Sequence, residues 1–295
     1  MTTRFSPRLR FSRQAKVTET EYEAVILSYF QDYLDSGDGR HVYVLKHPFR
    51  SLGALTTLYR LPCLYLSHSS PGSEGTITWE ILQRHSILVP SVGFIMSALR
   101  LPHEPGQYSL GASKQTLRRK IRKAERLGIY WAEVQDAQER LDLLKLADDR
   151  ERTHPDAKYR NSNPDNSDLL SYKLWLAAYS AEGRPLLLSV TPVDGDFAYL
   201  RYFRTLGDGE EESNARYLMT DVLAEQLVSR RARYLLDCAF PAWQYEGLRH
   251  FQRMIGYEVV RIRVARPSPS GREDYPEMID PQPEPPGGVE MSAQH

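Results

Sequence analysis

Segments typical of strands and helices alternate over residues 186–264, and this alternation constrains the fold more than any other feature of the chain. Four apolar runs start at Leu186, Phe197, Tyr234 and Tyr257. An Asp-Gly turn separates the first two runs, and helical patterns separate the others. The order strand, strand, helix, strand, helix, strand favours an α/β layer in which helices cover a central sheet. A binding site is expected where the strands of that sheet diverge.

The composition limits the classes to which the protein can belong. With 295 residues, of which 41% are hydrophobic, the chain can form one large or two compact domains. Its 38 basic and 38 acidic side chains cancel, so any electrostatic function must be local. No apolar run reaches the roughly 20 residues of a membrane span, and no signal core follows the N-terminus. Cys63 and Cys238 lie in apolar runs and indicate buried thiols, which fits a cytoplasmic protein.

Shifts in composition divide the chain into four segments. We expect a flexible basic arm at 1–19, a mixed α/β lobe at 20–112, an α/β domain at 113–265 and a disordered tail at 266–295. The arm is either a solvated terminus or a segment that contacts phosphate. The tail is rich in proline and acidic residues, and it either keeps the protein soluble or shields a basic surface.

The N-terminal lobe contains no motif that indicates chemistry. Its patterns predict a helix at 21–34 and strands at 41–46, 61–66 and 92–101. Pro71-Gly72 predicts a turn, and a helix-like run follows at 79–84.

Residues 113–128 predict a strongly basic helix. Leu117, Ile121 and Ala124 form its apolar stripe, Ser113 is a possible N-cap and Gly128 a C-terminal stop. Seven Lys and Arg side chains stand on the other faces, against one Glu. They are either solvated and paired with acidic neighbours, or they bind a phosphate-rich ligand such as an RNA acceptor end. The candidates for phosphate binding are Arg118, Arg119, Arg122, Lys123 and Arg126.

The next segment continues the alternation of strands and helices. It predicts a strand at 129–134, then a helix capped by Asp136 and Glu139, with Leu141, Leu144 and Ala147 on its apolar face. A polar loop at 152–167 is expected to precede a second helix, which ends before Gly183. The apolar stripe of that helix would comprise Leu170, Leu174, Ala177 and Ala181.

Three stretches together resemble the GNAT fold of acyltransferases, and in particular its Fem-type (FemXAB-like) aminoacyltransferases. They are the basic helix with its Arg-Arg-x-Ile-Arg-Lys-Ala core at 118–124, the helix and strand at 214–238, and the Gly-Leu-Arg-His-Phe-Gln-Arg-Met-Ile-Gly-Tyr motif at 247–257. The resemblance covers about half of the chain. It implies an α/β (α+β) fold with a GNAT-like mixed sheet flanked by helices, beside the N-terminal mixed lobe.

The resemblance implies an N-acyltransferase that forms an amide between an activated donor and a small-molecule or peptide amine. Fem-type enzymes use aminoacyl-tRNA, whereas other GNAT enzymes hold the pyrophosphate of coenzyme A on a glycine-rich loop before the third helix. Here the corresponding residues 207–216 have early glycines and three consecutive glutamates, which favours aminoacyl-tRNA. Either donor would be a co-substrate, and no tightly bound cofactor is expected. A coenzyme A-dependent N-acetyltransferase and a non-catalytic GNAT-fold binding protein are the alternatives.

Candidate site residues follow from this resemblance and from their positions. Asp237, at the end of the penultimate strand, could deprotonate the amine; alternatively it caps the next helix or pairs with Arg201. Tyr202 and Tyr217 could supply protons or line the acyl pocket. Candidates for donor binding are Ser213, Asn214, Arg216, Arg249, Gln252 and Arg253. Gln252 replaces the lysine of the Fem-type motif, and Asn214 could instead be an N-cap. The histidines show no metal-ligand spacing, so no metal site is expected.

Overall fold

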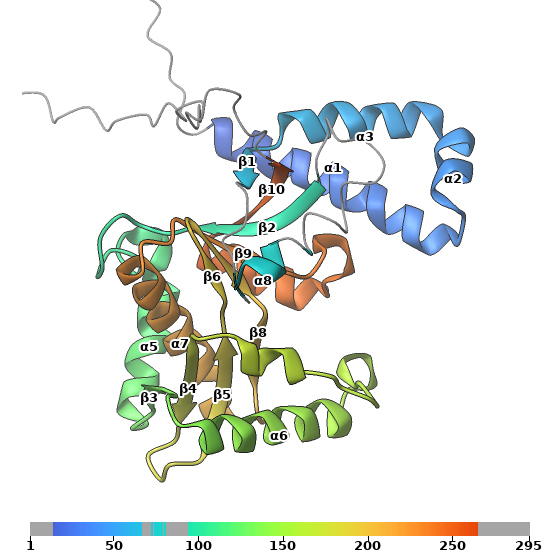
Figure 1. Ribbon diagram of the computed structural model, residues 1–295. Helices are drawn as coiled ribbons and strands as arrows, with labels where there is room; N and C mark the ends of the chain where they lie inside the picture. Colours follow the sequence, from blue (N-terminus) through green and yellow to red (C-terminus); the bar gives the residue numbers. More distant parts are fainter. Residues whose placement is uncertain (1–13, 67–71, 73, 79, 81–93, 265–295) are drawn as a thin grey trace, which may run out of the picture. The chain divides into compact units, whose positions relative to one another are not determined.

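The computed structural model describes residues 14–66, 72, 74–78, 80 and 94–264, and they form two β-sheets flanked by helices (Figure 1). The expected α/β class with mixed sheets is therefore confirmed. Residues 1–13 of the predicted arm, the predicted tail and most of the helix-like run at 79–84 lie outside the described residues. No helix in the described part of the chain is both long and apolar enough to span a membrane.

The described chain begins with three helices and then combines strands and helices, with strands β4 to β8 in succession. The α-helices are α1 (Gln14–Ser36), α2 (Arg40–Lys46), α3 (Pro48–Arg60), α5 (Gln115–Arg126), α6 (Ala137–Thr153), α7 (Glu210–Ser229) and α8 (Glu246–Ile255). The strands are β1 (Cys63–Leu66), β2 (Phe94–Arg100), β3 (Tyr130–Glu133), β4 (Trp175–Tyr179), β5 (Pro185–Val190), β6 (Val193–Asp194), β7 (Phe197–Leu200), β8 (Tyr202–Thr205), β9 (Tyr234–Asp237) and β10 (Tyr257–Val264). Short 3-10 turns occur at η1 (Ala112–Lys114), η2 (Ala157–Tyr159), η3 (Ser167–Ser171) and η4 (Pro241–Trp243).

The two sheets share helix α7 as a common cover. The six-stranded sheet has the order β1-β10-β2-β9-β7-β6, and the four-stranded sheet has the order β3-β4-β5-β8. One hydrophobic core contains side chains of α5 and α7 together with one face of both sheets. A second core lies between α6 and the other face of the four-stranded sheet. The central strands β4 and β5 of the four-stranded sheet are thus buried on both faces, with α5 and α7 on one side and α6 on the other (Figure 1).

Burial on both faces explains one wrong prediction. The helix expected on the stripe of Leu174 and Ala177 is strand β4, and all five residues of β4 are buried. A short, continuously apolar run has no period of two, so its pattern does not distinguish a central strand from a buried helix. Its pairing with both β3 and β5 made it a strand.

A second wrong prediction concerns residues 41–46, which form helix α2 and not a strand. The apolar residues there do not form the buried face of a strand, because Val42 and Val44 are both exposed. Only Tyr43 is deeply buried among residues 41–46, and its ring packs edge-on against Tyr29 and Tyr33 of α1. The contact of a single aromatic side chain with α1 therefore outweighed the local strand propensity.

Most other predicted elements are confirmed. Helix α1 contains the expected helix but begins earlier, at Gln14. The other two predicted strands of the lobe correspond to β1 and β2, and β3, β9, α8 and β10 lie where they were expected. Asp136 caps α6 by accepting a hydrogen bond from the Glu139 N–H at 2.8 Å. The two cysteines are half-buried free thiols.

The basic helix α5 is confirmed, but the predicted role of Ser113 is not. Ser113 lies in the 3-10 turn η1, and no side chain caps α5. Gly128 ends the helical segment in the left-handed region at φ +72°. A Cβ atom at Gly128 would also lie 2.9 Å from the Cβ of Ala181, so the position requires glycine for two reasons.

The Gly128→Ala substitution should therefore destabilise the protein by about 1 to 3 kcal/mol, from the left-handed backbone and the contact with Ala181. Urea denaturation of the variant and the wild type measures the difference. Gly53→Ala is the matched control, because Gly53 lies inside α3 with free space around it. Alanine there should leave stability unchanged or raise it by up to about 1 kcal/mol. Equal stability of Gly128→Ala and wild type would contradict the expectation.

Candidate functional site

The site is built where the chain leaves one sheet and joins the other. The expected single strand at 197–203 is two strands: β7 pairs in parallel with β9, and β8 pairs antiparallel with β5 in the other sheet. Between them the N–H of Arg201 donates to the carbonyl of Tyr199 at 2.7 Å, which turns the chain away from β9. The last residues that pair across β7 and β9 are Leu200 and Asp237. Two parallel strands therefore diverge directly after Asp237.

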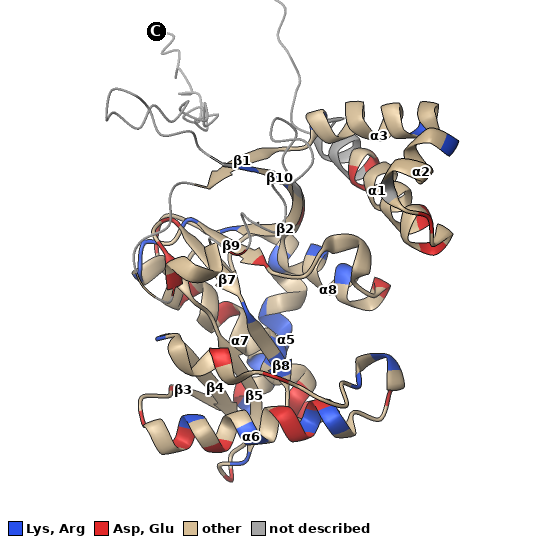
Figure 2. Cartoon of the chain, turned by 45° about the vertical axis from the view of Figure 1, so that its right-hand side comes forward, with Lys and Arg blue, Asp and Glu red and all other residues tan. Residues whose placement is uncertain are grey.

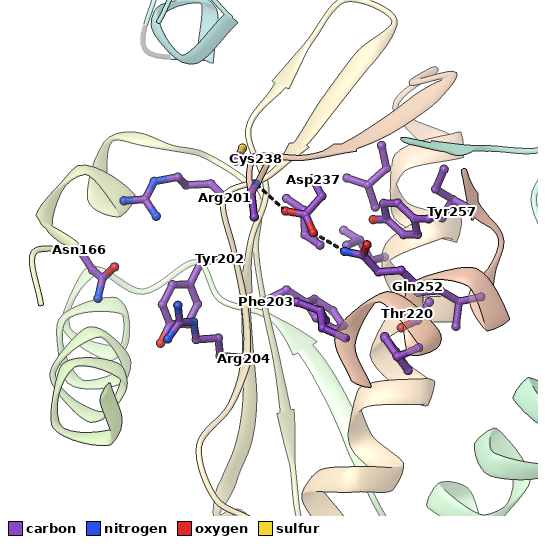
Figure 3. A pocket seen from close by; sticks show the side chains of 18 of the residues that line it. Asn166, Arg201, Tyr202, Phe203, Arg204, Thr220, Asp237, Cys238, Gln252 and Tyr257 are labelled. Atoms are coloured by element: carbon purple, nitrogen blue, oxygen red, sulfur yellow. Dashed lines mark hydrogen bonds between the residues drawn. The ribbon is translucent and has the colours of Figure 1, made fainter. Parts of the chain in front are cut away.

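A cavity of about 480 Å³ opens at this fork (Figure 3). Its wall includes residues of β8, β9, α7, α8 and the loop after α6. In Figure 3, Phe203, Asp237 and Gln252 lie on one side of the strand that carries residues 201–204, and Tyr202 and Arg204 lie on the other. The cavity therefore extends to both faces of the diverging strands, and its two ends have different chemistry.

The end near α8 is apolar except for Asp237 and its partners. Asp237 is 7% exposed and points to the same face as Leu235, while Leu236 and Cys238 face a separate core. One carboxylate oxygen of Asp237 accepts the N–H of Ala239 at 2.8 Å. The other accepts N–H groups from the side chains of Gln244, at 2.9 Å, and Gln252. The alternative that Asp237 pairs with Arg201 is wrong, because Arg201 forms a bidentate pair with Asp168 at 2.8 Å.

Burial dominates the protonation of Asp237. It raises the pKa of the carboxyl group to about 6, although the hydrogen bonds from Ala239, Gln252 and Gln244 act in the opposite direction. Neutral amides stabilise the carboxylate less than a full positive charge would. The group can therefore gain and lose a proton close to neutral pH, as a general acid or base must.

The other end of the cavity is polar and contains Tyr202. The Tyr202 side chain is 3% exposed, and its hydroxyl group lies close to the Glu151 carboxylate but makes no hydrogen bond of ordinary geometry among the described residues. Burial, followed by the nearby charge of Glu151, raises the pKa of this phenol. Asp237 and Tyr202 thus line one cavity but lie on opposite sides of β8 (Figure 3).

Tyr217 and Arg216 lie beside the cavity and not in its wall. The ring of Tyr217 packs edge-on against Phe251 at 5.4 Å, and the guanidinium of Arg216 stacks over the same ring at 5.7 Å. Within the described part of the chain Arg216 has no acidic partner. Burial lowers its pKa from the ordinary arginine value.

Ser213 and Asn214 lie inside α7, since this helix begins at Glu210. The N–H of Ser213 donates to the carbonyl of Gly209, and the side chain of Asn214 donates to the carbonyl of Glu210 at 2.8 Å. Asn214 is fully buried and is not an N-cap. Neither residue offers a free donor to a ligand from these groups.

The three glutamates at 210–212 form the first turn of α7, where negative charge is favourable. Glu210 pairs with Lys123, and Arg184 pairs with Glu211 at 2.7 Å and Glu212 at 2.6 Å. The carboxylate of Glu212 is buried over the glycines that precede the helix. A Cβ atom at Gly207 or Gly209 would collide with it. An internal carboxylate thus fills the space that a bound anion would need.

The remaining candidates for donor binding lie on α8. Gln252 is buried and bound to Asp237, as described above. Arg249 is half-exposed, and Arg253 forms an ion pair with Glu23 of α1 at 2.8 Å. Arg253 therefore links α8 to α1, and its charge is already paired.

Lys and Arg are concentrated along helix α5 (Figure 2), and some of these side chains are paired while others are not. Arg118 donates to the carbonyls of Ser109 and Gly111, at 2.7 and 2.6 Å, and Lys123 pairs with Glu210. Three exposed arginines have no acidic partner among the described residues: Arg119, Arg122 and Arg126. Pairing with acidic neighbours thus explains only part of the positive charge of this helix.

Several residues of the polar end were not predicted from the sequence. They include Glu151, Asn166 and Arg204, which all line the cavity. For Glu151 a signal was present, because it continues the buried stripe of Leu144 and Ala147 one turn later along α6. For Asn166 and Arg204 no local pattern exists. No group of three or more side chains suited to a metal ion occurs among the residues that the structure describes.

Comparison with known proteins finds distant likenesses. No family model and no curated protein matches the chain. The C-terminal domain of a protein described as a lysylphosphatidylglycerol synthetase, from Agrobacterium fabrum, is 14% identical and matches 62% of this chain and 70% of its own, with a TM-score of 0.43. L-PGS from Bacillus licheniformis is 13% identical, over 57% of this chain and 60% of its own, with a TM-score of 0.40.

A functionally unknown conserved protein from Staphylococcus epidermidis is 12% identical, over 57% of this chain and 58% of its own, with a TM-score of 0.33. The match thus spans less than two thirds of the second and third of these proteins. Likenesses with TM-scores below 0.5 identify no family.

The raised pKa of Asp237 predicts how stability depends on pH. The folded pKa of about 6 exceeds the ordinary value of 3.8, so folding favours the protonated carboxyl group. This stabilisation is complete below about pH 4 and is lost as the pH rises through 6, by up to about 3 kcal/mol. In Asp237→Asn that loss should be absent, so its unfolding free energy, measured in urea between pH 4 and 7, should fall less than that of the wild type. The exposed Asp35→Asn is the control, and a wild-type pH dependence in Asp237→Asn would refute the assignment.

Proposed function

We propose that this protein is an acyltransferase of the Fem-like GNAT type, which transfers an aminoacyl group from aminoacyl-tRNA to an amine. The observation that carries the proposal is the buried Asp237 at the fork of two parallel strands, in a cavity, with a pKa of about 6. Ligands of open α/β sheets bind outside the carboxyl ends of such strands. The resemblance of the sequence to Fem-type enzymes supports the same activity.

In the proposed reaction Asp237 accepts a proton from the amine. The neutral amine attacks the acyl carbonyl carbon, the carbonyl oxygen gains negative charge, and the ester oxygen of the donor leaves with a proton. No covalent intermediate with the protein is required. Strand β8 is the edge strand of its sheet, so every second residue directs its backbone groups away from β5 without a strand partner. An N–H of this edge could stabilise the developing oxyanion.

Two features support aminoacyl-tRNA over acyl-coenzyme A as the donor. The buried carboxylate of Glu212 fills the space before α7, where it would repel a pyrophosphate. On α5, the exposed arginines 119, 122 and 126 lack acidic partners among the described residues, and α5 packs on α7, which contributes Thr220 and Leu223 to the cavity wall. Unpaired arginines on one helix provide a surface for RNA phosphates.

Reversal of charge on α5 tests the donor. Arg119→Glu and Arg122→Glu, singly and together, should weaken the binding of aminoacyl-tRNA and lower the slope of log affinity against log salt concentration by about 1 per substitution. Fluorescence anisotropy at several salt concentrations measures both quantities. Lys145→Glu, an exposed charge on α6, is the one-charge control. Saturable binding of acetyl-coenzyme A without any binding of tRNA would contradict the proposal and favour a coenzyme A-dependent enzyme.

Replacement of Asp237 tests the chemistry. In Asp237→Asn the rate of amide formation should fall about a hundredfold or more, because the proton acceptor is lost. The wild-type rate should rise as the pH increases through about 6, the pKa of Asp237, and the residual rate of the variant should lack this rise. Asp142→Asn, on the exposed face of α6, should keep the wild-type profile. Absence of turnover in the wild type with either donor, while a ligand binds tightly, would favour a non-catalytic binding protein.

A further inference from the structure

The polar end of the cavity contains a carboxylate that lacks a strong partner. Glu151 is 5% exposed. Its oxygens are contacted by the side-chain N–H groups of Asn166 at 3.3 Å, Asn161 at 3.5 Å and Arg204 at 3.4 Å. All three distances exceed the roughly 2.7 to 2.9 Å of a good charge-assisted hydrogen bond. A buried carboxylate held only by long contacts can still gain free energy from a closer donor.

A second group at this end also lacks a strong partner. Tyr202 belongs to the cavity wall, and its buried hydroxyl makes no hydrogen bond of ordinary geometry among the described residues, although the carboxylate of Glu151 lies close to it. Buried hydroxyl groups are nearly always hydrogen-bonded in folded proteins. Glu151 and Tyr202 therefore present an acceptor-only group and a weakly bonded hydroxyl side by side. Together they suit a ligand group that carries several N–H donors.

Arg204 shows which charge this end accepts. Its guanidinium lies 5.7 Å from the centre of the Tyr202 ring and touches Glu151, while its side chain is 52% exposed. The face of an aromatic ring and a carboxylate both attract cations. Because Arg204 is half in solvent and its contacts are long, a smaller cation that fits deeper can displace it.

We infer that Glu151 and Tyr202 form the binding site for the α-ammonium group of the aminoacyl donor, and that Arg204 occupies this site when the donor is absent. The inference rests on the proposed function for the identity of the donor. The ammonium group would donate to the Glu151 carboxylate and to the Tyr202 oxygen. The two ends of the cavity then have separate tasks: one holds the charged amino group of the donor, and the other, at Asp237, takes the proton from the acceptor.

Small esters test the inference without tRNA and without turnover. Alanine methyl ester retains the α-ammonium group, whereas N-acetylalanine methyl ester is neutral at the same position. Isothermal titration calorimetry with the full-length protein should show that the free-amine ester binds about tenfold more tightly than the blocked one. Glu151→Gln should abolish that preference. Tyr202→Phe should reduce it by about threefold, since the oxygen that would accept a hydrogen bond is removed.

Arg204→Ala should change affinity in the opposite direction. If Arg204 competes for the site, its removal should tighten the binding of alanine methyl ester by about threefold or more and leave the blocked ester unaffected. A merely structural role of Glu151 does not predict that Arg204→Ala binds alanine methyl ester more tightly. This variant therefore tests the inference even if Glu151→Gln folds poorly. Arg152→Ala, an exposed arginine that does not line the cavity, is the matched control and should bind as the wild type does.

Equal binding of the two esters by the wild type, or unchanged binding in Arg204→Ala, would overturn the inference. A stronger response to 1,3-diaminopropane than to alanine methyl ester would also overturn it, because the ammonium group would then belong to the acceptor. Failure of the proposed function would give a different result from failure of this inference. Selective binding of the free-amine ester would persist, while no acyl transfer from aminoacyl-tRNA would occur with any amine.

Discussion

The site depends on one backbone turn at Arg201, where the chain stops pairing with β9 and enters the other sheet. The N–H of Arg201 bonds to the carbonyl of Tyr199, and its guanidinium is held by both oxygens of Asp168. These contacts fix the turn, so that β7 stays in one sheet while β8 enters the other. The strands part at Leu200 and Asp237, and the cavity forms between them because none of the described strands fills the gap.

The pKa of the Asp237 carboxyl group is set by the balance between burial and hydrogen bonding. Three N–H donors favour the charged carboxylate, but burial in an apolar wall outweighs them and raises the pKa to about 6. The residue at 252 matters for this balance. A lysine there, as in Fem-type enzymes, would bring a full positive charge and favour the ionised form, whereas Gln252 brings only a dipole. The glutamine therefore suits a group that must exchange a proton near neutral pH.

The neighbours of the charged segments in the fold decide which of their side chains are paired and which stay free to bind a ligand. In the sequence alone, the acidic residues 210–212 and the basic residues of 113–128 resemble two solvated charge clusters. In the fold, Glu210 and Lys123 join α7 to α5, and Arg184 holds Glu211 and Glu212. What is left after this pairing is a set of exposed arginines on α5, and these carry the case for a phosphate-rich ligand.

The sequence by itself determined the α/β class, the order of strands and helices over residues 186–264, and Asp237 as a candidate, because turns, helix caps and periodic patterns are local. It did not distinguish β4 from a helix or α2 from a strand, since burial on both faces and the packing of Tyr43 on α1 depend on distant residues. The fork at Arg201, the side-chain amides around Asp237 and the proximity of Glu151 and Tyr202 arose only in the tertiary structure. They depend on groups that are separated in the sequence, as in the pair of Arg201 with Asp168 and the bond from Gln252 to Asp237, and no local pattern encodes such contacts.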